Sequence, residues 1–419
     1  MRSNSFRFNL QELGGALGDV GTLLPLMVAL ILINGLNPTS VLILVGLFYI
    51  GSGLYYRVPT PVQPLKAVAA IAITLGLSAS VIGAAGLIIG VILLLLSVTN
   101  FITIVVKLFP QAVVRGIQLS IGLILLKKGV ELAFSEQTFI SGAAGSFGAG
   151  QVPIGLLLAA SALLIFILFK FVFFRKSQRF PPSLALLTFG LGTGVIFGYI
   201  PGVDKMGPAL PSIALPSAAD FWTALIVLVI PQLPLTLGNA VVGTWDTART
   251  YFKDQAHRVR PRALTTSMGL ANIVAGLVGG MPMCHGSGGL TAHYKLGART
   301  GAANLMIGGS ILIVGLFLGS AAVPFLSVIP LSVLGVLLAI VGIYHAFLIR
   351  DLRAKRQLAV AGTVAVVTIA LGSLAFGFAA GILLHHISRL DISRAWRHSL
   401  ETVKHYRKEE ERPESIDAV

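Results

Sequence analysis

The 419-residue chain has a single cysteine, Cys284, and few charged residues. One cysteine excludes a disulfide within the chain and any cysteine-rich metal site. Charged residues make up 11% of the sequence, against about 25% in soluble domains, and so few charges could not cover a soluble protein of this size. The polar N-terminal stretch lacks the short apolar core and cleavage site of a signal peptide. The composition predicts an integral membrane protein.

The sequence also lacks the motifs of several function classes. It contains no phosphate-binding nucleotide loop, zinc-ligand spacing or catalytic triad, so we expect no cofactor, no metal site and no enzyme activity. Acidic residues are scarce, since 31 Lys and Arg stand against 16 Asp and Glu, for a net charge of +15. A basic balance can indicate nucleic acid, anionic lipid or membrane topology. Here the basic residues are spread over loops without interleaved aromatic residues, so nucleic-acid binding is not expected.

What the sequence does have is long apolar runs. A helix needs about 20 residues to cross about 30 Å of hydrocarbon. Two segments, 62–78 and 285–300, are shorter and are interrupted by proline or glycine. Counting both, the sequence predicts an all-α polytopic protein of about fourteen spans, the others being 13–33, 40–56, 81–106, 111–131, 152–174, 183–200, 221–243, 263–279, 302–323, 329–349, 357–372 and 373–388.

The basic residues fit fourteen crossings with both termini in the cytoplasm. On that topology all but four of the 31 Lys and Arg lie on the cytoplasmic side, as the positive-inside rule requires. The exceptions are Lys127, Lys128 and Lys205 outside, and Lys66 within a short segment. We therefore expect a plasma-membrane protein embedded in the lipid bilayer, with a short cytoplasmic tail at residues 391–419.

Three short matches at nearly one offset indicate an internal repeat. They are Leu17-Gly18-Asp19 with Leu237-Gly238-Asn239, Pro61 with Pro282, and Phe109-Pro110 with Ile329-Pro330, 220 or 221 residues apart. Because seven spans per copy is an odd number, the second copy would be inverted. We expect one repeat in residues 1–200 and the other in residues 201–390. Inverted repeats with broken helices at equivalent positions are typical of secondary transporters, with the site at the repeat interface.

Three prolines, Pro59, Pro61 and Pro64, interrupt the first short segment. A continuous helix cannot hold them, so we expect extended backbone and a helix that begins near Pro64. Its N-terminus would present free N–H groups and about half a positive charge. Gln63 would add an amide donor and Lys66 a full positive charge. The alternative is a surface loop from which Lys66 reaches the membrane interface.

The second short segment has five glycines between Gly279 and Gly289. Glycine lets a ligand or another backbone approach closely. Gly286 and Gly288 flank the Ser287 hydroxyl, and the His285 imidazole precedes them, an arrangement that suits an anion. With the first segment it would form two half-helix N-termini facing each other across the midplane. The alternative is close helix packing through small residues, with His285 as a hydrogen-bonded structural group.

Ionisable residues inside spans are costly and usually functional. Asp19 occupies the repeat position of Asn239, which places both near the predicted interface. Asp19 could pair with Lys66 or carry a coupled proton, and His285 is the other candidate proton carrier because imidazole titrates near neutral pH. Glu12 is expected at a cytoplasmic helix end, as a cap.

The two short segments resemble the signatures of the molybdate transporter type 1 family. The first is Pro59-Thr60-Pro61-Val62-Gln63-Pro64-Leu65-Lys66 followed by 67–73, and the second is 281–290 with His293-Tyr294 and 297–301. The sequence departs from the family pattern at Leu65, where Met is usual, and at Thr291 and His293, where Ala and Gln are usual. The resemblance extends loosely over the whole membrane region.

This resemblance implies the fold of the related sulfate permease (SulP) transporters and of uracil permease. In that fold two inverted repeats of seven spans form a core domain and a gate domain that move in an elevator-type cycle. Two half-helices preceded by short extended strands hold the substrate between them. The wider sulfate permeases carry a C-terminal regulatory domain, for which residues 391–419 are too few.

The resemblance further implies a secondary transporter that imports a tetrahedral oxyanion, molybdate above all, with sulfate or tungstate as other candidates and protons as candidate co-substrates. The expected substrate-binding residues are Asp19, Gln63, Lys66, Asn239, His285, Gly286, Ser287 and Gly288. A proton-coupled nucleobase transporter of the same fold is a rival, although no carboxylate stands between Met281 and Leu290 to pair with ring N–H groups. An anion channel or a non-transporting receptor is another. The coupling ion, the direction of transport and the presence of a homodimer stay open.

Overall fold

The computed structural model describes residues 6–99, 101, 110–135, 146–147, 152–173, 182–197, 206–209, 215–319 and 321–388. Within these residues the chain is mostly helical, and each of the fourteen predicted segments contains a helix, which confirms the predicted class. Phe109, Lys205 and the tail at 391–419 lie outside the described residues.

The first half of the chain starts with a broken helix. α1 (Leu10–Ala16) passes through the 3₁₀ turn η1 (Leu17–Asp19) into α2 (Val20–Asn34), so the first predicted span is irregular around Asp19. The elements that follow are α3 (Pro38–Tyr56), β1 (Gln63–Pro64), α4 (Lys66–Leu75), α5 (Ala79–Val98), α7 (Gln111–Ala133), β2 (Ser146–Phe147), β3 (Val152–Pro153), α8 (Ile154–Leu168), the π-helix η3 (Phe169–Phe173) and α10 (Pro182–Ile196).

The second half starts with one long helical stretch, Ala218–Ala256, that changes its winding several times. Its parts are α11 (Ala218–Thr223), the π-helix η4 (Ala224–Val229), α12 (Ile230–Leu235), the π-helix η5 (Thr236–Gly243), α13 (Thr244–Phe252) and the 3₁₀ turn η6 (Lys253–Ala256). Pro231 and Pro234 remove two N–H donors there, and π turns often mark functional sites. The later elements are α14 (Pro261–Leu277), β4 (Met283–Cys284), α15 (Ser287–Lys295), α16 (Ala302–Leu318), α17 (Ala322–Ser327), α18 (Leu331–Ala346), η7 (Phe347–Asp351), α19 (Lys355–Leu371) and α20 (Leu374–Ile387).

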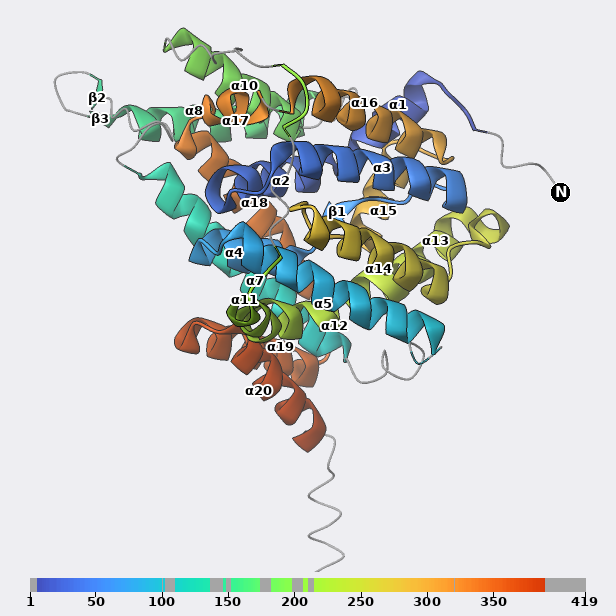
Figure 1. Cartoon of the computed structure of the whole chain (residues 1–419). Coiled ribbons are helices and arrows are strands. Elements are labelled where there is room, and N and C mark those ends of the chain that lie inside the picture. The colour runs from blue at the N-terminus through green and yellow to red at the C-terminus, as the bar shows by residue number, and fades with distance from the viewer. Residues whose placement is uncertain are drawn as a thin grey trace, which may run out of the picture.

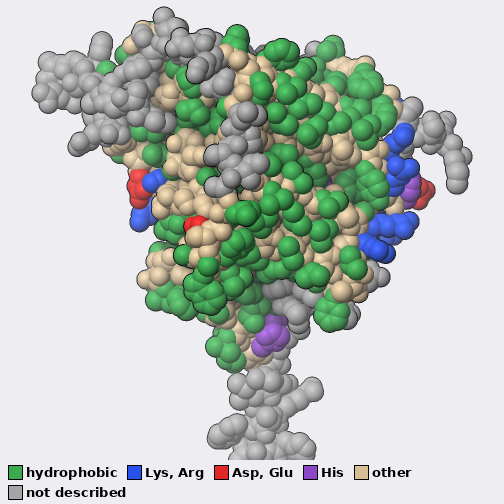
Figure 2. Space-filling model, viewed as in Figure 1, with side chains coloured by type: hydrophobic (Ala, Val, Ile, Leu, Met, Phe, Trp, Pro, Cys, Tyr) green, Lys and Arg blue, Asp and Glu red, His purple; other side chains and the backbone are tan. Residues whose placement is uncertain are grey.

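The exterior is that of a membrane protein. Five helical stretches in the described residues are long and apolar enough to cross a membrane: Pro38–Tyr56, Ala79–Val98, Ile154–Phe171, Ala218–Ala256 and Leu331–Asp351. Five further apolar helices are shorter. Figure 2 shows hydrophobic side chains over most of the visible face, with Lys and Arg gathered at its edges. Large apolar side chains such as Ile196 and Val366 are 82% and 67% exposed, as expected of a surface that faces lipid.

Three antiparallel helix pairs, α3 with α16, α5 with α14 and α7 with α18, pack through glycines. A Cβ added at Gly46 would lie 2.8 Å from the Gly308 carbonyl oxygen, and one at Gly122 would lie 2.6 Å from that of Gly342. Each pair makes a second such contact seven residues away. For α3 and α16 it lies between Gly53 and Gly301, and for α7 and α18 between Gly129 and Gly335. The two contacts of α5 with α14 are Gly83 with Gly276 and Gly90 with Gly269. Small residues at crossings are how membrane helices bring their backbones together.

The helices form two groups, one around and one beside a two-stranded sheet that we call the ladder. β1 pairs antiparallel with β4, in the register Gln63↔Cys284 and Pro64↔Met283, and β1 and α15 lie between α3 and α14 in Figure 1. Helices α1–α5 and α11–α16 surround this ladder, whereas α7, α8, α10 and α18–α20 pack on one another beside it. The short strands before α4 and α15 confirm what the family resemblance implied for the two broken segments.

The glycine contacts lead to a stability prediction. Gly122→Ala should lower the melting temperature of the detergent-purified protein, because the new methyl would lie 2.5 Å from the Ala346 nitrogen and overpacking costs about 1–3 kcal/mol. Gly362→Ala on α19 is the matched control, since a Cβ there meets no atom within 4 Å and alanine favours a helix by about 1 kcal/mol over glycine. Equal melting temperatures for the two variants would contradict the close crossing.

Candidate functional site

Both half-helices begin directly after the ladder. Leu65 donates its N–H to the Pro282 carbonyl at 3.0 Å, which joins the two broken segments just before α4 starts. The residues before the helices, Leu65 and Gly286, are extended, and neither caps its helix with a side chain. The first N–H groups of α4 and α15 therefore need partners from elsewhere.

At α4 the partner is Gln232 of α12. Its Oε1 accepts from the N–H of Ala67 at 2.8 Å and from that of Val68 at 3.3 Å, and its Nε2 donates to Thr236 Oγ1 at 3.0 Å. Gln232 is 1% exposed. The sequence analysis missed this residue, although a glutamine between two prolines inside an apolar span is the signal that could have found it. Two of the donors expected to face a ligand at α4 are thus occupied.

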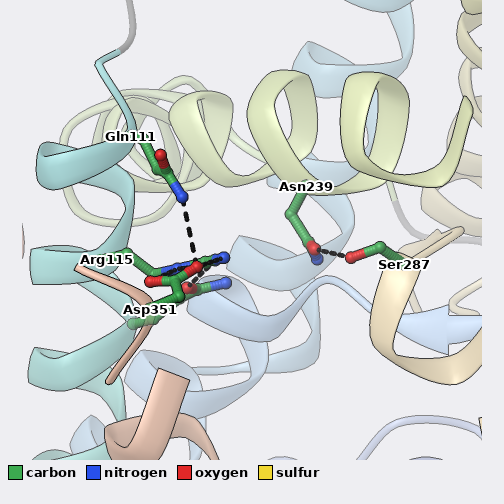
Figure 3. A network of polar contacts seen from close by, with 6 residues as sticks. Gln111, Arg115, Asn239, Ser287 and Asp351 are labelled. Carbon is green, nitrogen blue, oxygen red and sulfur yellow. Dashed lines mark hydrogen bonds and ion pairs between the residues drawn. The ribbon is translucent and has the colours of Figure 1, made fainter. Parts of the chain in front are cut away.

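At α15 the corresponding donors are open. Among the described residues no side chain accepts from the N–H groups of Ser287, Gly288 or Gly289. Gly288 is exposed, and a Cβ there would meet no atom within 4 Å. Ser287 is half-buried and donates to Asn239 Oδ1 at 2.7 Å, as Figure 3 shows. The first turn of α15 therefore offers backbone donors beside an exposed residue, Gly288.

A hydrogen-bond chain leads from Lys66 into the core. Lys66 Nζ donates to Gln63 Oε1 at 2.6 Å, Gln63 Nε2 donates to Asp19 Oδ1, and the Tyr49 hydroxyl donates to Asp19 Oδ2 at 3.2 Å. Asp19 and Gln63 are 1% and 2% exposed, and Lys66 is half-buried. Asp19 thus reaches Lys66 through the Gln63 amide, and both ends of that amide are engaged.

Glycines of α15 pack directly on this chain. A Cβ at Gly286 would lie 2.6 Å from Gln63 Oε1 and 3.1 Å from Lys66 Nζ. A Cβ at Gly289 would lie 2.6 Å from Gln63 Nε2 and 2.7 Å from Asp19 Oδ1. The first turn of α15 therefore lies against side chains from the first half of the chain, and a side chain at either position would displace these polar groups.

His285 has partners on both ring nitrogens. Nδ1 is 2.8 Å from the Pro61 carbonyl oxygen, and Nε2 is 3.1 Å from Ser267 Oγ, which in turn lies 2.8 Å from the Tyr56 hydroxyl. The ring is fully buried, with the Phe48 ring 4.9 Å away. This is the geometry of a hydrogen-bonded structural group, the alternative that the sequence left open.

Two further polar networks join segments that are far apart in the sequence. Glu12 accepts from the N–H groups of Arg299 and Thr300 at about 3 Å, in the loop between α15 and α16. The expectation that Glu12 caps a helix is wrong here, because α16 begins at Ala302 with no side-chain cap. Arg115 of α7 forms an ion pair with Asp351 of η7, to which Gln111 also donates at 3.2 Å (Figure 3). This second network ties α7 to the end of α18, within the other helix group.

The predicted residues divide into an accessible layer and a buried layer. The accessible ones are Lys66, Asn239, Ser287 and Gly288, and the buried ones behind them are Asp19, Gln63, His285 and Gly286. The accessible layer offers a cation, a hydroxyl, an amide and free N–H groups, and it contains no carboxylate. Such a set suits a small anion. No group of three or more His, Cys, Asp or Glu in the described ranges could hold a metal ion.

Comparison with known proteins agrees with this chemistry. Residues 11–125 and 224–345 match the family model described as "Molybdate transporter of MFS superfamily". Molybdate transporter 2 of Arabidopsis thaliana is 32% identical, with 90% of this chain and 87% of the relative covered. Molybdate transporter 1 of Arabidopsis thaliana is 34% identical, with 91% and 88% covered. Molybdate transporter 1 of Chlamydomonas reinhardtii is 29% identical, with 89% and 90% covered.

Solved structures share the fold. The transmembrane domain of a cyanobacterium bicarbonate transporter, BicA, superposes with a TM-score of 0.64 at 18% identity, over 88% of this chain and 96% of that one. SLC26A9 superposes with a TM-score of 0.65 at 16% identity, over 90% of this chain and 64% of that longer one. The fold is therefore that of the SLC26 and BicA transporters, as the resemblance implied.

The accessible layer can be tested by chemical labelling. Gly288→Cys should react with a water-soluble thiol reagent in the folded protein, because position 288 is exposed to open space. The wild type supplies its own control, since its one cysteine, Cys284, is 3% exposed. Labelling of the native wild type, or an inert Gly288→Cys, would contradict the division into two layers.

Proposed function

Because the chain belongs to the molybdate transporter family, we propose that it is a secondary active transporter that imports a tetrahedral oxyanion. Molybdate is the first candidate, and sulfate and tungstate are its competitors. The observation that carries the proposal is the open N-terminus of α15 beside Lys66, at a surface where the accessible layer has no carboxylate. The nucleobase rival needs such a carboxylate, and nothing in the site favours it.

The oxyanion would sit against α15 and between the two half-helices. Its oxygens would accept from the Gly288 N–H, the Ser287 hydroxyl and the Asn239 amide, with Lys66 Nζ on the opposite side. Ser287 now donates to Asn239, and both groups can turn to a ligand. Gln63 and Asp19 would act behind Lys66 by holding its ammonium in place. His285 would position the ladder through its bond to the Pro61 carbonyl.

Charge balance suggests a coupled proton. The oxyanion carries two negative charges, whereas the site offers one lysine and about half a charge from the helix N-terminus. Asp19 lies one amide away from Lys66, and an ionised carboxylate there would add a third negative charge at membrane depth, where unbalanced charge is costly. We propose that a proton on Asp19 accompanies the anion.

The architecture supports an elevator-type cycle built on inverted repeats, 1–200 and 201–390. Lys66 and Ser287, 221 residues apart, both open a half-helix, and Pro110 and Pro330, 220 apart, are the extended residues before α7 and α18. The helix group around the ladder would be the moving core. The group of α7, α8, α10 and α18–α20 would be the gate.

Uptake of labelled molybdate into proteoliposomes tests the site. Lys66→Met should raise the KM at least tenfold, which is about 1.4 kcal/mol, since hydrogen bonds to charged groups contribute about 1.5–3 kcal/mol. Lys127→Met is the matched control, because that lysine lies on the exposed end of α7, with 80% of its side chain exposed. An unchanged KM in Lys66→Met would remove Lys66 from the site.

A pH gradient tests the coupling. Molybdate should accumulate in wild-type proteoliposomes when the outside is acidic, and a protonophore should abolish the accumulation. Asp19→Asn should lose the dependence on the gradient but keep exchange of labelled for unlabelled molybdate, because asparagine keeps the size of the side chain. Gradient-driven accumulation by Asp19→Asn would show that the proton travels elsewhere.

A further inference from the structure

One helix holds the starts of both half-helices. Gln232 binds the first turn of α4 through two N–H groups, and Asn239 binds Ser287 at the first residue of α15. The two residues stand seven positions apart in the unbroken stretch Ala218–Ala256. We call Gln232 and Asn239 the clasp.

The helical stretch that contains the clasp packs closely against both α15 and α7. A Cβ at Gly243 would lie 3.3 Å from Ser287 Oγ, so the long helix runs close against α15. A Cβ at Gly238 would lie 3.2 Å from Val114 Cγ2, so the same turn also touches α7 of the other helix group. Thr236, fully buried, accepts from Gln232 Nε2 and fixes the rotamer of that amide. Both half-helix starts are therefore held by one helical stretch that lies close against α15 and α7.

The separation of the two half-helix starts matters because the candidate substrates have the same shape and charge. Molybdate, tungstate and sulfate are all divalent tetrahedral oxyanions, and sulfate is the smallest because its bonds are shorter by a few tenths of an ångström. A site discriminates at that scale only when its groups are held to about 0.5 Å. Residue types at the site cannot supply the discrimination, because every donor there would bond any of the three anions.

We propose that the clasp selects the oxyanion by size, with Gln232 as a positioning residue that acts through α4. The proposal rests on the proposed function. Gln232 does not need to touch the anion. It occupies two α4 donors and holds Lys66, the first residue of α4, at a fixed distance from Ser287.

The test is a competition experiment in proteoliposomes. Uptake of labelled molybdate is measured at rising concentrations of unlabelled sulfate or tungstate. The inhibition constant of each competitor, divided by the KM for molybdate, gives the sulfate ratio and the tungstate ratio, and a high ratio means strong discrimination. Gln232→Met keeps the length of the side chain and removes the acceptor. We expect it to lower the discrimination against sulfate at least fivefold and to leave the tungstate ratio within twofold. Gln118→Met is the control, a glutamine 1% exposed on α7 whose side chain accepts from Arg115 rather than from a half-helix, and it should change neither ratio.

Each outcome has one meaning. An unchanged sulfate ratio in Gln232→Met, or a wild type that takes sulfate and molybdate equally, overturns the size selection and leaves the proposed function intact. Absence of any oxyanion uptake by the wild type overturns the proposed function itself. If Gln232→Met does not fold, Thr236→Val decides, because it keeps Gln232 but removes the partner of its amide. A twofold or greater fall in the sulfate ratio then supports the clasp, and an unchanged ratio refutes it.

Discussion

The structure depends on one constraint, the need of every backbone N–H at membrane depth for a partner. In the proposed transporter two half-helices would start within the membrane, where a backbone donor costs several kcal/mol when it is unpaired in hydrocarbon. The chain supplies partners in different ways at the two starts. The ladder joins Gln63–Pro64 to Met283–Cys284, and Gln232 accepts from two N–H groups of α4. At α15 no side chain of the described residues accepts from the first N–H groups, and in the proposed function the anion takes them.

Close packing of the helices stabilises the two half-helix starts in a chain with few charges. Paired glycines let α3, α5 and α7 touch their partner helices at the backbone, and small-residue crossings give membrane proteins the rigidity that hydrophobic burial gives soluble ones. The same device recurs at Gly286 and Gly289, where the missing side chains admit Gln63, Lys66 and Asp19. Glycine thus allows both the close helix crossings and the close approach of these polar side chains to α15.

Much of this could be predicted from particular residues. Pro59, Pro61 and Pro64 forbid a continuous helix, so the break and the half-helix after it follow from the sequence alone. The glycines before Leu290 predict the second break in the same way. Which face each side chain takes could not be predicted, because it depends on partners far away in the chain. His285 turns to Pro61 and Ser267, and Gln232 reaches α4 across 165 residues.

The two halves of the site are chemically unequal, and this inequality bears on how it would work. The first half contributes Asp19 and Lys66, an acid and a base joined through Gln63, whereas the second contributes Asn239 and Ser287, which are neutral. The titratable groups, Asp19 and Lys66, therefore lie on the α4 side of the site, and the open backbone donors lie on the α15 side. If both sides carried a lysine, a divalent anion would be held too tightly for release. If neither did, the dipoles alone would leave most of its charge unbalanced at membrane depth. On the proposed function, one titratable half and one neutral half would let a single proton on Asp19 set the affinity of the site.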